Sequence, residues 1–144
     1  MKKQNKLWIC LILMIVLAIL SGCAGLIETA EVGIVVNPNP VPFNSEDGGW
    51  WYYLTFDESN GIGVTLISLR FDGYSQAEEL IYTNLYYEED IIDWFGSNYI
   101  PAFSTLSEWV RHTGTNPYTI ITVRGVDDDN NRIVAIGRAD YLSK

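Results

Sequence analysis

A run of strand-favouring residues, Trp50–Phe56, constrains the fold of this 144-residue chain more than any other segment. Aromatic and β-branched side chains favour the pleated surface of a sheet. Because successive side chains of a strand point to opposite faces, the run divides into two sets. The set predicted to face the core is Trp50, Tyr52, Leu54 and Phe56. The other set, Trp51, Tyr53 and Thr55, is expected to point outward.

Further strand-favouring runs recur at short spacing, with turn-forming residues between them. They cover residues 34–36, 62–71, 79–87, 104–111, 118–124 and 133–136. With the first run they predict an all-β domain of about seven strands. Both faces of the 62–71 run become apolar after Leu66, so we expect this strand to be central or to contain a bulge. The prolines of Asn37–Pro42 remove backbone donors, which predicts a sheet edge or a strand that changes sheets.

One segment departs from the β pattern. The apolar residues of Ile91–Phe95 have the spacing of one or two helical turns. The acidic run Glu88–Asp90 precedes them, where the positive end of a helix favours acids, and Gly96 is placed to end the helix. We therefore expect one short helix in the domain.

The segment from Val32 to Leu142 resembles the immunoglobulin-like and fibronectin type III-like β-sandwich domains of exported bacterial proteins. The resemblance rests on the strand count, the proline-rich first strand and a closing hairpin whose turn runs from Val126 to Arg132. It implies an immunoglobulin-like β-sandwich over residues 32–144, with Tyr118 near the position of the tyrosine corner. The paired cysteines of many such domains are absent, and a small β-barrel is the structural alternative.

The N-terminal residues have the pattern of an export signal. Lys2, Lys3 and Lys6 precede an apolar run, Leu7–Leu20, that contains no charge and no proline. The run ends in Leu20-Ser21-Gly22-Cys23, which resembles the lipobox of bacterial lipoprotein precursors. The resemblance implies that residues 1–22 are a removed signal peptide and residues 23–31 a tether. It also implies that Cys23 carries acyl chains such as palmitate, which attach the protein to a membrane.

Two other interpretations of this segment stay open. The run from Leu7 to Ile27 approaches the length of an uncleaved transmembrane helix. The second interpretation is a plain secretory signal peptide that is cleaved near Ala24. Ala24 also stands where an Asp retains many lipoproteins in the inner membrane. The lipobox resemblance therefore implies the cell envelope, and the outer membrane if the source has one.

The charge balance restricts the partners of the mature chain. The whole chain has 9 Lys and Arg against 18 Asp and Glu; removal of Lys2, Lys3 and Lys6 leaves 6 against 18, a formal charge of −12. This balance argues against nucleic acid, whose phosphates need clustered cations. It predicts no basic patch and no electrostatic adhesion to anionic lipid, so acyl chains must hold the protein on a membrane. Cys10 lies in the removed run, so no disulfide is expected in the mature domain.

Catalytic chemistry finds little support in the sequence. His112 is the only histidine, and it lies in an expected loop without a Gly-x-Ser-x-Gly motif anywhere in the chain. Glu88, Glu89 and Asp90 form a charge run of the kind that is usually solvated. We therefore predict that the protein is not an enzyme and has no catalytic residue and no cofactor. A small envelope hydrolase is kept as a less favoured hypothesis, after the two binding functions described below.

The acidic turn at residues 127–131 offers oxygen ligands for Ca²⁺ through Asp127, Asp129 and Asn131. The loop does not match an EF-hand that starts at Asp127, because Arg132 stands where the motif needs glycine and Arg138 stands at its last ligand position. A looser calcium site remains a candidate, and a solvated hairpin turn is the default. Zinc has too few nitrogen and sulfur ligands, so no metal is predicted.

Outward aromatic residues are the main candidates for ligand contact. Trp51 and Tyr53 are expected on the outer face of their strand, joined by Tyr86 or Tyr87 from a neighbouring strand. The preferred interpretation is that the short helix covers these rings. The first functional hypothesis is then a non-enzymatic envelope lipoprotein whose domain binds a protein partner. The alternative is a carbohydrate-binding module that stacks these rings on a glycan.

Overall fold

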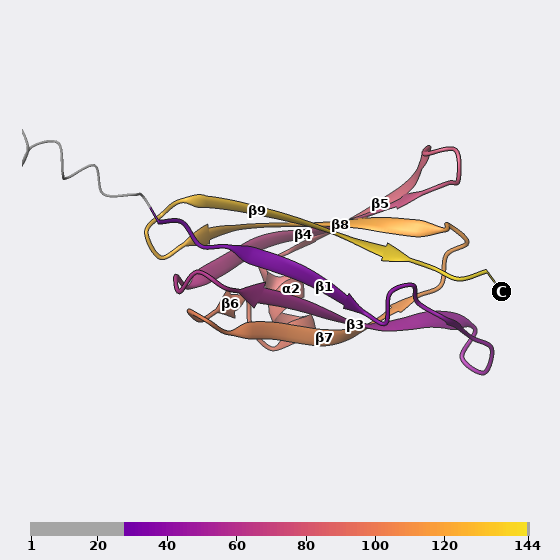
Figure 1. Cartoon of the computed structure of the whole chain (residues 1–144), viewed down its shortest axis with the longest axis horizontal. Helices are drawn as coiled ribbons and strands as arrows, with labels where there is room; N and C mark the ends of the chain where they lie inside the picture. Colours follow the sequence, from indigo (N-terminus) through magenta and orange to yellow (C-terminus); the bar gives the residue numbers. More distant parts are fainter. Residues whose placement is uncertain (1–27, 144) are drawn as a thin grey trace, which may run out of the picture.

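The structure of the protein, a computed structural model, describes residues 28–143 and contains two packed antiparallel sheets (Figure 1). The signal segment, the lipobox and Cys23 lie outside the described residues. The four-stranded sheet contains β1 (Val32–Asn37), β2 (Phe43–Asn44), β3 (Gly49–Glu58) and β7 (Thr105–His112). The five-stranded sheet contains β4 (Val64–Tyr74), β5 (Leu80–Tyr87), β6 (Tyr99–Ile100), β8 (Tyr118–Asp127) and β9 (Arg132–Asp140).

The core lies between the two sheets and is built as the alternation of β3 predicts. Tyr52 is 1% exposed, and Leu54 and Phe56 are fully buried. The facing side chains of the five-stranded sheet are Leu66, Leu69, Phe71, Ile121 and Val123, all buried. The prediction of an all-β immunoglobulin-like sandwich is confirmed. The seven longer strands are those expected, whereas the two-residue strands β2 and β6 are too short for a sequence pattern.

Strand β4 is both central and bulged, as expected. It pairs with β5 on one side and with β8 on the other, and its register with β8 shifts between Leu66 and Ser68. The extra residue turns Ile67 outward, while Leu66 and Leu69 on either side of it stay buried. A bulge therefore explains why both sides of this strand are apolar.

The proline-rich segment links two strands of the four-stranded sheet, β1 and β2, and touches the end of the other sheet on the way. Among the described strands, β1 pairs only with β3, at the edge of the four-stranded sheet. After Pro40 the Val41 N–H donates to the Asp140 carbonyl (2.7 Å), and the Leu142 N–H donates to the Val41 carbonyl (2.9 Å). Both contacts are with the end of the five-stranded sheet, but the chain then returns to the four-stranded sheet at β2. Of the two expectations, the sheet edge is confirmed, since β1 is an edge strand.

Helix α2 (Glu88–Phe95) follows β5 directly and ends at Gly96, whose φ of 77° suits glycine. Its buried residues, Ile91 and Phe95, enter the core, where the rings of Phe95 and Phe56 lie 5.4 Å apart. Among residues 28–143, no helix has the length and apolar character needed to span a membrane.

Candidate functional site

Large side chains gather on the outer face of the four-stranded sheet. Register pairs Trp51 of β3 with Arg111 of β7, and Tyr53 with Trp109. Antiparallel pairing with a side-chain period of two places all four on one face. Trp51, Tyr53 and Trp109 are 37%, 38% and 53% exposed. We call these four residues the aromatic strip.

Contacts within the aromatic strip hold its side chains in a defined arrangement. The rings of Tyr53 and Trp109 lie 5.3 Å apart at an angle of 56°. The Arg111 guanidinium lies 5.8 Å from the centroid of the Trp51 ring, a cation–π geometry. Arg111 also donates to the Asp47 carbonyl in the turn before β3. The Tyr53 and Trp109 rings are therefore tilted relative to each other and do not form a coplanar row.

The structure brings together only two of the four predicted contact residues. Tyr86 points inward, 5.9 Å from the Phe71 ring, and Tyr87 lies on the outer side of the other sheet. The expectation that they extend the row of Trp51 and Tyr53 is wrong, because β5 pairs with β4 and not with the four-stranded sheet.

The preferred interpretation that α2 covers the outward rings is also wrong. The helix packs against β4, β5 and β7, and its Trp94 ring lies on Phe71 and Tyr86. It buries its apolar side at the open edge of the sandwich, not on its outer face. Sequence reasoning missed Trp109 and Arg111, although the alternation of Leu106 and Val110 in the 104–111 run placed them on the opposite face.

The acidic turn is a hairpin turn whose residues 128–130 are exposed, as the default interpretation had it, but it is organised by Asp127, which is buried. Its carboxylate accepts four N–H groups, those of Ala30, Asp129, Asn131 and the Asn131 side-chain amide. Burial by itself would raise the pKa of Asp127. The hydrogen bonds from Asn131, Ala30 and Asp129 outweigh this effect, so the pKa lies below its ordinary value.

This geometry does not fit the calcium candidate. Both Asp127 oxygens already accept two N–H groups each, and the Asn131 amide points its nitrogen at Asp127. Ca²⁺ needs free oxygens instead. Among residues 28–143 no group of three His, Cys, Asp or Glu side chains is arranged to hold a metal ion.

Glu58 is a second buried carboxylate without a cationic partner among the described residues. It accepts the N–H groups of Asn60, Gly61 and Phe103 at 2.9 Å each, and that of Glu31 at 3.4 Å. Burial raises its pKa, but the backbone N–H groups, that of Phe103 first, outweigh burial and lower it. This carboxylate therefore holds the backbone of these residues in place.

His112 ends strand β7 and does not lie in a loop as expected. Its ring stacks on Tyr141 with centroids 4.2 Å apart, beside a cleft of about 590 Å³ whose lining includes Trp50 and Asn116. Burial lowers the pKa of His112, and the facing Asn116 side chain opposes this shift in part. Among residues 28–143 no Ser or Thr hydroxyl hydrogen-bonds to His112, so the hydrolase hypothesis gains no nucleophile.

The assignment of Tyr118 to a tyrosine corner is wrong. Its ring stacks on Tyr74 at 5.5 Å and lies 3.9 Å from the Arg138 guanidinium, on the outer side of the five-stranded sheet. The ring therefore packs on the surface of the sheet, away from the corner where such a tyrosine would bond the preceding backbone.

Comparisons with known proteins find structural likenesses alone. No family model matches the chain, and no curated protein matches it. The ApaA protein from Bordetella pertussis is 12% identical over 81% of this chain and 98% of that chain, with a TM-score of 0.48. The CARDB domain of a Pyrococcus furiosus protein, solved with di-metal ions, is 16% identical over 79% and 88%, with a TM-score of 0.39. A FixG-related protein from Vibrio parahaemolyticus is 11% identical over 81% and 100%, with a TM-score of 0.39.

Proposed function

We propose that this protein is a lipid-anchored component of the bacterial cell envelope whose β-sandwich binds a protein partner through the aromatic strip. The anchor is Cys23, at the end of the apolar run. One acyl chain binds a bilayer only marginally, each buried CH₂ contributing about 0.8 kcal/mol, so several chains on Cys23 are needed for stable attachment. The domain itself has no catalytic role.

The exposure of the aromatic strip carries the proposal. Tryptophan, tyrosine and arginine are the residues that dominate the binding energy of protein interfaces. Here they occur together, in register on two paired strands, and the helix that was expected to cover them lies elsewhere. A large apolar surface left exposed on a sheet face marks a binding site more often than a solvated face.

A protein partner fits the strip better than a glycan. Sugar rings stack on aromatic faces, and a row of coplanar rings would serve several of them. The 56° angle between Tyr53 and Trp109 gives an uneven surface, and Arg111 adds donors suited to a carboxylate or a carbonyl. Carbohydrate binding stays the alternative function.

Capture of a partner from intact envelopes tests the binding site. The Trp51→Ala and Trp109→Ala variants are expected to retain at least about tenfold less of the partner that the unchanged protein captures. Phe103→Ala is the matched control, since Phe103 is 76% exposed at the end of the sandwich, outside the strip. Equal capture by all variants would refute the strip, and retention on glycan columns that depends on Trp51 would assign it to carbohydrate.

Membrane fractionation tests the anchor. Cys23→Ala is expected to appear in the soluble fraction or to accumulate as unprocessed precursor, and to lose labelling with fatty acid. Cys10→Ala provides the control, because Cys10 lies within the proposed signal peptide. Unchanged processing and labelling of the Cys23 variant would exclude the lipoprotein assignment.

A further inference from the structure

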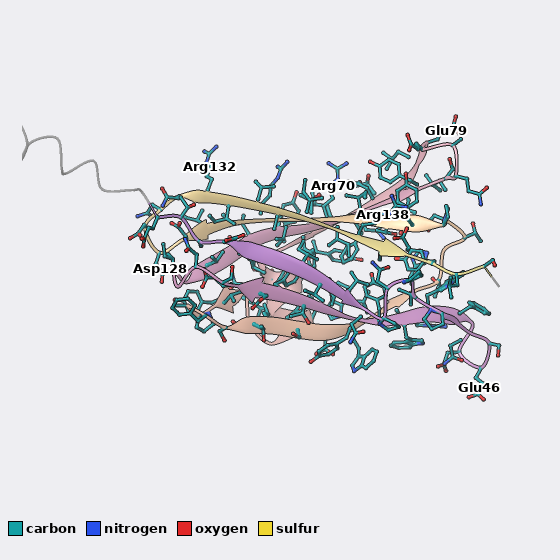
Figure 2. The ribbon with its side chains drawn as sticks, in the orientation of Figure 1. Glu46, Arg70, Glu79, Asp128, Arg132 and Arg138 are labelled. Carbon is teal, nitrogen blue, oxygen red and sulfur yellow. The ribbon has the colours of Figure 1, made fainter. Side chains whose placement is uncertain are left out.

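The outer face of the five-stranded sheet holds most of the positive charge of the mature chain. Of the six Lys and Arg after residue 23, four lie on this sheet: Arg70, Arg124, Arg132 and Arg138. Figure 2 shows Arg70 and Arg132 extending from the upper side of the sheet, away from the four-stranded sheet. Arginines therefore gather on this face although the mature chain as a whole is acidic.

Exposed apolar side chains alternate with these arginines. Register aligns Tyr87, Ser68, Arg124 and Val134 in one row across β5, β4, β8 and β9. Tyr87 and Val134, at the two ends of the row, are 60% and 59% exposed. The β4 bulge adds the outward Ile67 next to Tyr87. An outer sheet face in contact with water normally carries polar residues, so this composition points to a covered surface.

Two of the four arginines have no acidic partner among the residues that the structure describes. Arg70 pairs with Asp72 at 2.8 Å and Arg138 pairs with Asp140 at 2.7 Å. Within residues 28–143, Arg124 and Arg132 form no ion pair, although acids outnumber cations in the chain. Both border a shallow groove of about 500 Å³ that Ile67, Tyr87 and Val134 also line.

An acidic groove adjoins this basic one. It measures about 440 Å³ and is lined by Ile67, Tyr87 and the acidic run Glu88–Asp90 at the start of α2. Asp90 accepts the Tyr87 N–H, whereas Glu88 and Glu89 are exposed and take part in no ion pair among the described residues. Ile67 and Tyr87 line both grooves, so they lie between two arginines on one side and two glutamates on the other.

We propose that two copies of this chain pair through this face, with Arg124 and Arg132 of each copy against Glu88 and Glu89 of the other. A closed two-fold dimer needs a self-complementary patch, in which residue i meets j and j meets i. A two-fold axis that lies in the interface and passes over Ile67 and Tyr87 brings the basic groove of one copy to the acidic groove of the other. The apolar side chains then form the centre and the charges the rim.

The direction of the axis also suits a membrane protein. The basic and acidic grooves are displaced from each other across the strands, so the axis between them runs along the strands. Rotation about such an axis leaves the strand direction unchanged, and both copies present Ala30 at the same end. This one point rests on the proposed lipid anchor, whereas the pairing itself does not. The aromatic strip stays free on the opposite sheet.

Sedimentation of the full chain in density-matched detergent micelles tests the pairing. The unchanged protein is expected to form dimers as its concentration rises from about 1 to 200 µM. Arg124→Glu and Glu89→Arg should each weaken association roughly tenfold, because each puts like charges together at both ends of the two-fold interface. Glu46→Arg makes the same charge change as Glu89→Arg at an exposed turn next to the opposite sheet, outside the aromatic strip, and should leave association unchanged.

Mixing the two variants distinguishes self-pairing from any other role of the face. In a mixed dimer, the carboxylate introduced at position 124 of one copy would face the guanidinium introduced at position 89 of the other. The second rim contact would join the unchanged Arg124 of one copy to the unchanged Glu89 of the other. An equimolar mixture should therefore recover dimers that neither variant forms alone, with circular dichroism confirming that both are folded.

Three results would each overturn the proposal: a monomeric unchanged protein, a mixture no better than its components, or dissociation by Glu46→Arg. Monomers that bind an acidic peptide through Arg124 would also overturn it, and would assign the face to a different protein.

Discussion

Glu58 and Asp127 belong to different sheets yet bind adjacent residues of the same entering segment. The Asp127 carboxylate accepts the Ala30 N–H at 3.2 Å, and the Glu58 carboxylate accepts the Glu31 N–H at 3.4 Å. Ala30 and Glu31 were assigned to the tether from the sequence, but Ala30 is buried against the sandwich. The two carboxylates therefore fix the backbone of residues 30–31 at the point where the described chain enters the domain.

Acid is expected to destabilise the domain through these two groups. Both native pKa values lie below the ordinary values of 4.5 for Glu58 and 3.8 for Asp127. The unfolded chain therefore binds more protons, so the stabilisation is complete above about pH 4.5 and is lost as pH falls through the lowered native values. The contribution of these two carboxylates to the urea midpoint should be constant from about pH 7 to 5 and then fall steeply.

The Glu58→Gln variant separates this effect from general acid unfolding. The glutamine amide nitrogen would face the N–H donors of Gly61 and Phe103, leaving them unpaired at a cost of about 1–3 kcal/mol at neutral pH. The loss of stability in acid should also become shallower. Glu79→Gln, on an exposed residue, is the control and should change neither quantity. Identical acid profiles for Glu58→Gln and the unchanged protein would contradict the assignment.

Calcium should have no effect on stability. The Asp127 oxygens accept N–H donors, and a cation would have to displace Ala30 and Asn131 to reach them. We expect the same melting temperature with a chelator and with millimolar Ca²⁺, to within about 1 °C, because a ligand that binds only the native state would raise it. A rise that Asp129→Asn abolishes would restore the calcium site.

Strand β8 should be sensitive to a single methyl group on Gly125, which pairs with Leu66 beside the β4 bulge. A Cβ there would lie 2.6 Å from the Thr65 carbonyl oxygen, which belongs to the neighbouring strand and has little freedom to move. Gly125→Ala is expected to cost about 1–3 kcal/mol in urea unfolding. Gly33→Ala is the control, since its Cβ would meet only the Asp57 carbonyl at 3.8 Å. Equal stabilities would show that the sheet relaxes around the methyl group.

The fold was predictable because short periodic patterns determine it, whereas the site depends on which strands become neighbours. Alternation in β3 predicted both its core face and its outer face. Alternation alone does not say that β7 pairs with β3 and places Trp109 beside Tyr53, because that pairing joins residues far apart in sequence. Tyr86 and Tyr87 were misplaced for the same reason, since β5 belongs to the other sheet.

The buried carboxylates show a second limit. Glu58 and Asp127 stand in polar, turn-like sequences that predict solvent exposure. Their burial is favourable only because backbone N–H groups converge on them, and those groups come from Ala30, Glu31 and Phe103 as well as from nearby residues. Such tertiary convergence leaves no local signature.

His112 offers a direct spectroscopic check of the aromatic cluster. Burial between Tyr141 and Tyr82 lowers its pKa below the ordinary 6.5, so it stays neutral where an exposed histidine begins to protonate. Stability should therefore fall as pH drops from about 6.5 towards the lowered value, because the unfolded state takes up the proton first. As the only histidine, its ring protons give one NMR titration.

The Asn116→Asp variant reverses the direction of this shift. A carboxylate in place of the amide that faces His112 favours the protonated ring, so the NMR midpoint should move up from that of the unchanged protein. An ordinary midpoint near 6.5 in both proteins would mean that the ring is open to solvent.

Two tryptophans are expected to have opposite roles in stability and binding. Trp94 of α2 packs 5.5 Å from Tyr86 and 6.0 Å from Phe71, so Trp94→Ala should cost about 2–3 kcal/mol in urea unfolding through the cavity that it leaves. Trp109 is 53% exposed and its ring packs on the outer Tyr53 ring, so Trp109→Ala should cost less than about 1 kcal/mol. Partner capture should show the reverse order, lost for Trp109→Ala and kept by the folded fraction of Trp94→Ala. Comparable destabilisation by both variants would mean that the aromatic strip supports the sheet. The loss of partner capture by Trp109→Ala would then follow from unfolding and not from a missing contact.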